Sequence, residues 1–501
     1  MRTTLILVVT LLTSMSGMRQ ITQQPQTAKT PSLVLSPCNI EGSSEKVKCG
    51  TYEVYENRSS KKGRKISLKI VVFPATDTQR EPDPFVYIPG GPGSSATEDA
   101  PYVAPDFAKI REHRDLLFVD QRGTGGSHPL NCKFYNAADI QSYLGYFFPL
   151  EDVRKCREQL EQKADLTLYT TPIAMDDLDE VRAALGYERL NLFGGSYGTR
   201  ASLVYLKQHP KHVRTVTLQG VAPTNQFMPR DFAQSMDRAL QGVLAECVAD
   251  EACNRAFPDL RAETKAVLER LIQGPVEVEV RKNFGRGGDA GAAANPEERV
   301  KVKLSRDLAV EAVRYALYNP GGASRAPLIL HQAAQGNFIP LAETALNYRR
   351  NLVGSGSNGM YLSVTCAEDL PWIKPGEGER LSANTFLGDY RLRQQREACA
   401  LWPRATIPKD YGEPVRGSAP VLILTGEWDP VTPPSNGDAT ARHLPNSLHV
   451  IVPHGAHGFG GLEGIDCIKN LHWEFVEKGT VKGLDTSCVK NIRRKGFSIA
   501  P

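Results

Sequence analysis

The stretch Leu190–Arg200, Leu-Asn-Leu-Phe-Gly-Gly-Ser-Tyr-Gly-Thr-Arg, constrains the fold more than any other part of the chain. An apolar run leads into glycines around Ser196, and an amphipathic segment, residues 201–206, follows them. This order indicates a buried strand, a tight turn and a helix. Such a turn holds its serine above the edge of a sheet, so the pattern predicts Ser196 as a nucleophile. A glycine-rich turn without chemistry is the alternative that this motif leaves open.

The rest of the chain predicts an α/β fold with a mainly parallel sheet and helices on both faces, because strands and helices alternate from residue 84 to residue 220. From about residue 224 to 407 this alternation gives way to helical stretches. We expect an all-helical insertion there, most simply a lid over the active site, with a structurally separate domain as the alternative. Expected strands are residues 52–56, 66–73, 84–89, 116–119, 190–193, 213–218, 420–426 and 448–452.

The predicted organisation has an α/β core in two parts, residues 37–223 and 408–501, with the lid at 224–407 between them. The N-terminus has Arg2, an apolar run to Leu12 and small residues at 14–17. This layout predicts a signal peptide over residues 1–17, and a polar leader over 18–36. No later segment reaches the roughly 18 apolar residues of a membrane helix. We therefore expect a secreted or periplasmic protein without a membrane span once the signal is removed.

The ten cysteines agree with export, because an even number in an exported chain suggests disulfides. Sequential pairing is expected since it closes short loops, although the sequence allows other connectivities. The expected pairs are Cys38–Cys49, Cys132–Cys156, Cys247–Cys253, Cys366–Cys399 and Cys467–Cys488. Metal binding is disfavoured because no C-x-x-C or H-x-x-x-H spacing occurs. A net charge of +4 without a basic cluster interleaved with aromatics argues against a nucleic-acid partner.

Two residues near the C-terminus complete a predicted catalytic set with Ser196. A serine hydroxyl needs an imidazole to take its proton and a carboxylate to orient the imidazole. Asp429 and His457 each follow an expected strand, which gives the chain order Ser, Asp, His of an α/β-hydrolase. His454 is a rival, but His457 lies between small residues at a turn.

An oxyanion hole is predicted beside this set. A glycine run, residues 90–95, directly follows the strand expected at 84–89. Backbone N–H groups there can face a developing negative charge, so we expect Gly91 to donate together with the backbone N–H of Tyr197. An ordinary strand-to-helix loop is the alternative.

Five motifs in order resemble the prolyl and tripeptidyl aminopeptidase family of α/β-hydrolases, over about residues 50–490. They are Pro89-Gly-Gly-Pro-Gly93, Asp120-Gln-Arg-Gly123, Gly194-Gly-Ser-Tyr-Gly198, Gly426-Glu-Trp-Asp-Pro-Val-Thr432 and Gly455-Ala-His-Gly458. The resemblance implies the removal of short N-terminal units from peptides through an acyl-enzyme. Together with the expected signal peptide it predicts an exported serine exopeptidase, and nothing in the sequence calls for a metal or an organic cofactor. Two departures, Pro89 for the histidine of the prolyl branch and Gln219 for an acidic residue in many relatives, affect the expected substrate.

An exopeptidase has to bind the ammonium group of its substrate, and a carboxylate in the lid is a suitable partner. Glu368 and Asp369 are the candidates, next to Cys366; a solvated helix start is the alternative. The same triad also serves an esterase or another hydrolase of small substrates. A catalytically silent binding protein is disfavoured because both the triad and the oxyanion loops are present.

Overall fold

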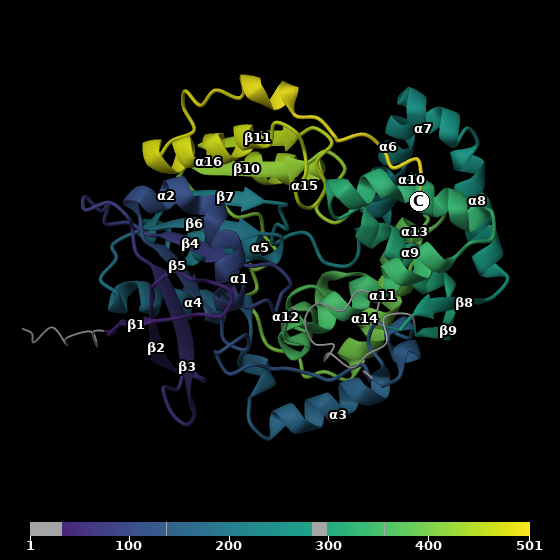
Figure 1. The fold of residues 1–501 in the computed structure, drawn as a ribbon. Coiled ribbons are helices and arrows are strands. Elements are labelled where there is room, and N and C mark those ends of the chain that lie inside the picture. Colours follow the sequence, from purple (N-terminus) through teal and green to yellow (C-terminus); the bar gives the residue numbers. More distant parts are fainter. Residues whose placement is uncertain (1–32, 137, 283–297, 355, 501) are drawn as a thin grey trace, which may run out of the picture.

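The computed structural model of the 501-residue chain describes residues 33–136, 138–282, 298–354 and 356–500 (Figure 1). The expected signal peptide and most of the polar leader lie outside the described residues. The last residues of the leader form the start of the first strand, at Ser36.

A central sheet of nine strands in the described residues has the order β1-β2-β3-β5-β4-β6-β7-β10-β11. β1, β2, β3 and β5 pair antiparallel in turn, and every pairing from β5 to β11 is parallel. The expected mainly parallel sheet is therefore confirmed. The strands are β1 (Ser36–Cys38), β2 (Val47–Tyr55), β3 (Lys65–Phe73), β4 (Phe85–Ile88), β5 (Leu116–Val119), β6 (Leu190–Gly195), β7 (Val213–Gln219), β10 (Val421–Gly426) and β11 (Ser447–Val452).

Helices cover both faces of this sheet (Figure 1). α4 (Thr171–Ala184), α5 (Tyr197–Gln208) and α15 (Pro434–Ala441) pack on one face, and α1 (Ala96–Val103), α2 (Ala108–His113) and α16 (Asp466–Lys478) on the other. Short apolar strands make this possible because successive side chains point to opposite faces. In β5, Leu117 joins the first core and Phe118 the second. Both faces of the central strands are consequently buried.

Much of the insertion between β7 and β10 forms a further hydrophobic cluster beside one end of the sheet, where the teal and green helices lie in Figure 1. Residues 360–373 and 392–402 of the insertion instead contribute to the first core. The insertion is not all helical, because β8 (Val276–Arg281) and β9 (Arg299–Leu304) pair antiparallel. The remaining helices are α3 (Leu150–Glu161), α6 (Phe232–Ala249), α7 (Glu251–Ala256), α8 (Leu260–Ile272), α9 (Arg306–Ala316), α10 (Pro320–Ala334), α11 (Ile339–Gly354), α12 (Asn358–Glu368), α13 (Glu377–Ser382) and α14 (Tyr390–Ala400).

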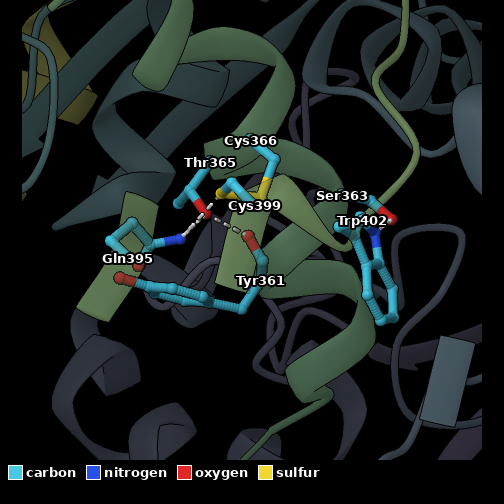
Figure 2. Close-up of a disulfide and its surroundings, with 7 residues drawn as sticks. All are labelled: Tyr361, Ser363, Thr365, Cys366, Gln395, Cys399 and Trp402. Carbon is cyan, nitrogen blue, oxygen red and sulfur yellow. Dashed lines mark hydrogen bonds between the residues drawn. A yellow bond between two sulfur atoms is a disulfide. The ribbon is translucent and has the colours of Figure 1, made fainter. Parts of the chain in front are cut away.

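All five expected disulfides are present, with sequential pairing. The bond between Cys366 and Cys399 joins α12 to α14 inside the insertion, and Figure 2 shows its surroundings. Among the described residues, no helix combines the length and the apolar character needed to cross a membrane.

Candidate active site

Ser196 lies at the sharp turn between β6 and α5. Its backbone has φ +54° and ψ −121°, a region that non-glycine residues rarely adopt, and its N–H donates to the carbonyl of Gln219 at 2.9 Å. Only glycine fits at two nearby positions, because a Cβ there would clash with backbone atoms. A Cβ on Gly198 would lie 2.0 Å from the carbonyl oxygen of Ile88, and one on Gly194 would lie 2.3 Å from the carbonyl oxygen of Gly198. The turn thus has the strained geometry that the sequence motif predicts.

His457 and Asp429 are hydrogen-bonded to each other, each in a loop that follows a strand. Nδ1 of His457 lies 2.8 Å from Oδ2 of Asp429. The fully buried carboxylate also accepts the backbone N–H groups of Val431 and Thr432, both at 2.8 Å, and the Thr432 hydroxyl at 2.7 Å. Burial alone would raise the pKa of Asp429, but His457 and the Thr432 hydrogen bonds hold it below its usual value. Asp429 is therefore an oriented anion behind the imidazole.

A cavity of about 420 Å³ connects the core with the lid. Ser196, His457 and Gly91 line it from the core side. The lid contributes aromatic and cationic side chains, including Phe232, Arg314, Tyr318, Tyr348, Tyr361 and Arg391. The lid also contacts the glycine loop directly, because the N–H of Ser357 donates to the carbonyl of Gly93 at 2.9 Å.

The glycine loop, residues 90–95, lies against the turn that holds Ser196. A Cβ on Gly90 would come within 3.1 Å of the Cβ of Ser196. Gly91 has φ +110°, and a Cβ there would lie 2.8 Å from the nitrogen of Gly93, so a side chain would not fit. The other expected donor, the N–H of Tyr197, belongs to the first residue of α5, while its side chain points inward and its hydroxyl lies 2.8 Å from Oγ1 of Thr171.

The rival histidine is placed elsewhere. Nδ1 of His454 lies 2.7 Å from Oε1 of Glu246, and His454 is not among the residues that line the cavity. Of the two histidines considered from the sequence, only His457 shares the cavity with Ser196.

The structure does not bring Glu368 and Asp369 to the cavity. Both are fully buried at the end of α12. Glu368 accepts hydrogen bonds from the N–H and hydroxyl of Thr171 and from the Tyr411 hydroxyl. Asp369 accepts from Arg200 at 2.8 Å and from the N–H of Met228 at 2.9 Å. The expectation that these carboxylates bind the substrate amine is corrected, because both are buried within the fold and neither lines the cavity.

Comparison with known proteins matches two parts of the chain. A model of the alpha/beta hydrolase fold matches residues 83–286, and a model described as TAP-like protein matches residues 384–488. The chain therefore has the α/β-hydrolase fold, and its C-terminal part is similar to TAP-like proteins.

Three relatives match most of the chain. Serine protease Hip1 of Mycobacterium tuberculosis is 24% identical over 490 residues, which is 90% of each chain. Tripeptidyl aminopeptidase of Streptomyces lividans is 24% identical and covers 88% of this chain and 83% of its own. Carboxylesterase B of Mycobacterium tuberculosis is 25% identical and covers 88% of this chain and 86% of its own.

Two side-chain clusters bring potential metal ligands together within the described residues. One contains Asp179, His209 and His212, and the other Glu246, Glu427 and His454. Each is already ion-paired, the first with Arg182 and the second with Arg494. Neither lies on the cavity.

The sequence reasoning missed the charged side chains of the cavity. Arg391 lies on α14 close to Arg393 and Arg396, and nothing in this arginine-rich stretch separates the one that lines the cavity from those that face solvent. Arg314 likewise lies on an amphipathic helix, α9, where its burial depends on the packing of the lid.

Proposed function

We propose that this chain is a member of the TAP-like α/β-hydrolases and an exported serine peptidase that releases short N-terminal units from peptides through an acyl-enzyme. The observation that carries the proposal is the Asp429–His457 hydrogen bond on the same cavity as the strained Ser196. The relatives that are a serine protease and a tripeptidyl aminopeptidase support peptide bonds as the target. The five disulfides support export.

In the proposed reaction, Nε2 of His457 takes the hydroxyl proton of Ser196 as Oγ attacks the substrate carbonyl carbon. Asp429 holds Nδ1 and stabilises the imidazolium that forms. The backbone N–H groups of Gly91 and Tyr197 bind the oxyanion, and the start of α5 adds the positive end of a helix dipole. His457 then gives its proton to the leaving amine, and a water molecule hydrolyses the acyl-enzyme by the same route in reverse.

An esterase on the same triad is the second candidate, and one observation favours it. Among the described residues that line the cavity there is no Asp or Glu to pair with a substrate ammonium group. A simple acyl ester needs no such partner. The carboxylesterase B relative is consistent with this alternative.

The test combines active-site labelling with matched substrates. A fluorophosphonate should label the wild-type protein but not Ser196→Ala. His457→Gln should lower kcat/KM by about 10⁴-fold or more, because both proton transfers are lost. His454→Gln serves as the matched control and should retain most activity, since its ring faces Glu246.

Tripeptidyl anilides with a free or an acetylated N-terminus and short acyl esters then separate the two candidates. Turnover of free-amine anilides supports the peptidase, and turnover of esters alone supports the esterase. Full activity of the His457→Gln variant, or labelling of Ser196→Ala at the wild-type rate, would contradict both.

A further inference from the structure

Arg391 stands out among the cavity residues because it is a buried cation stacked on an aromatic ring. The side chain lines the cavity, and the residue is only 4% exposed. Its guanidinium carbon lies 3.6 Å from the centroid of the Phe147 ring, which also lines the cavity. Stacking covers one face of the guanidinium plane and leaves the N–H groups along its edge available for hydrogen bonds.

Two of the guanidinium nitrogen atoms have no acceptor within the part of the chain that the structure describes. They are Nε and Nη1 of Arg391, and both are buried. Buried polar groups are nearly always hydrogen-bonded, so such a group in a substrate cavity indicates a missing partner. Burial by itself would lower the pKa of Arg391, but Glu311 and the surrounding tyrosines raise it, so the side chain stays charged.

Arg314, the other arginine of the cavity, is fully engaged. Its Nε and Nη2 donate to the two carboxylate oxygens of Glu311 at 3.2 and 3.0 Å, and its Nη1 donates to the Tyr318 hydroxyl at 2.9 Å. Glu311 also accepts from the Tyr390 hydroxyl. Arg314 is thus neutralised by a bidentate pair with a carboxylate, whereas Arg391 has no such pair among the described residues.

The charges at this end of the cavity do not balance. Glu311 is an anion, since Arg314 and Arg391 lower its pKa to about 2 although burial opposes this. Two guanidinium groups therefore face one carboxylate that Arg314 already binds. No Asp or Glu is among the described cavity-lining residues, which leaves a net positive charge beside Phe147.

We propose that Arg391 binds a carboxylate of the substrate, as a second subsite in the cavity that contains Ser196. The proposal rests on the proposed hydrolytic function and specifies its substrate class. Arginine suits the task because its planar donors match a carboxylate in a bidentate pair. The carboxylate is either an acidic side chain or the terminal carboxylate of a short peptide.

The surroundings hold Arg391 in place, as expected of a preorganised subsite. The disulfide between Cys366 and Cys399 ties α14 to α12, and Nε2 of Gln395 donates to Oγ1 of Thr365 at 2.9 Å across the same pair of helices (Figure 2). On the other side, the N–H of Phe147 donates to Oε1 of Gln394 at 2.7 Å. The ring and the guanidinium are thus attached to the same helix.

The test uses two matched pairs of substrates, which separate the two sources of the carboxylate. One pair has Glu or Gln at the same position of a peptide anilide, and the other is a short peptide with a free or an amidated C-terminus. Wild-type protein should prefer the charged member of at least one pair by about 10- to 100-fold in kcat/KM, the range for a buried charge-assisted hydrogen bond. Arg391→Met should remove this preference, so that the charged and neutral members of a pair have similar kcat/KM values.

Arg393→Met is the matched control, because Arg393 lies on the same helix with its side chain 42% exposed and paired with Asp307. It should keep the wild-type preference. Arg391→Lys should restore only part of the preference, since lysine keeps the charge and loses the planar pair of donors.

Binding in a Ser196→Ala background separates failure of this inference from failure of the proposed function. Calorimetric titration with the same peptides requires no turnover. Tighter binding of the charged member that disappears in Ser196→Ala/Arg391→Met supports the subsite, whatever bond the enzyme cleaves. Equal binding of charged and neutral members in both proteins would overturn it.

Discussion

The carboxyl group of Glu368 is linked through Thr171 to Tyr197, the first residue of α5. Oγ1 of Thr171 contacts both Oε2 of Glu368 and the Tyr197 hydroxyl, at 2.7 and 2.8 Å. Burial raises the pKa of Glu368 to about 7, although hydrogen bonds from Tyr411 and Thr171 oppose the shift. This carboxyl group therefore takes up a proton on folding in the mildly acidic range.

We predict that Glu368→Gln flattens the pH dependence of stability. With a folded-state pKa near 7 and an ordinary value near 4.5, the stabilising contribution is fully present below about pH 4.5 and is lost as pH rises towards 7. The difference in unfolding free energy amounts to roughly 3 kcal/mol for this group. Urea unfolding of both proteins at pH 4.5, 6 and 8 measures it. Parallel curves for the two proteins would contradict the prediction.

Among single residues, the sequence predicts the positions of those that follow a strand. Ser196, Asp429 and His457 each come after an apolar strand, and the carboxyl ends of parallel strands meet at one edge of a sheet. The role expected for Glu368 was wrong because depth of burial depends on tertiary packing. Arg391 was missed for the same reason.

Two helices of the insertion, α12 and α14, are joined by a disulfide. They carry Tyr361 and Arg391 into the cavity. Around the disulfide, Thr365 Oγ1 donates to the Tyr361 carbonyl at 2.8 Å, and the Trp402 indole donates to the Ser363 hydroxyl at 3.0 Å (Figure 2). The covalent link and these hydrogen bonds fix one helix against the other.

We predict that the double replacement Cys366→Ala/Cys399→Ala lowers the unfolding free energy by about 2–4 kcal/mol, because an unfolded chain without this cross-link is less constrained. Thermal unfolding followed by circular dichroism measures the loss. The matched control removes Cys38 and Cys49, which join β1 to β2 away from the lid. Only the lid pair should also raise KM, and an equal rise in both proteins would count against a role in holding the cavity.

Strands and helices with strong periodicity were predictable, whereas one pair of strands was not recognised. β8 reads Val-Glu-Val-Glu-Val-Arg and β9 reads Arg-Val-Lys-Val-Lys-Leu, a clear alternation of apolar and charged residues. Their position among long helices led to the expectation of an all-helical insertion. The hairpin buries Val280 and Val302 in the hydrophobic cluster of the lid and leaves its charged side chains exposed, which is the arrangement that this alternation specifies.

The C-terminal segment connects the core to the lid through contacts with two lid helices. Arg494 pairs with Glu246 of α6 at 2.9 Å and donates to the carbonyl of Pro320 in α10 at 3.1 Å. Four residues later, the N–H of Ser498 donates to the carbonyl of Ser324 at 3.1 Å. In Figure 1 the yellow C-terminal trace reaches these lid helices from the sheet.

We predict that Arg494→Met loosens the lid without unfolding the core. Glu246 would lose a buried cationic partner, at an expected cost of about 1–3 kcal/mol in local stability. Hydrogen exchange should therefore speed up in α6 and α10 while β6 and β7 stay protected. Lys495→Met is the matched control because the Lys495 side chain is exposed. Uniformly faster exchange in all these elements would indicate global destabilisation instead.

The neighbouring strands β7 and β10 are separated in the chain by the entire lid, from Gln219 to Val421. As the polypeptide is synthesised from its N-terminus, the backbone groups along the outer edge of β7 have no strand to pair with until β10 emerges. Asp429 and His457 follow β10 and β11, so the groups proposed to activate Ser196 are also made only after the lid. A nascent chain that has not yet reached these strands therefore lacks the acid and the base of the proposed triad.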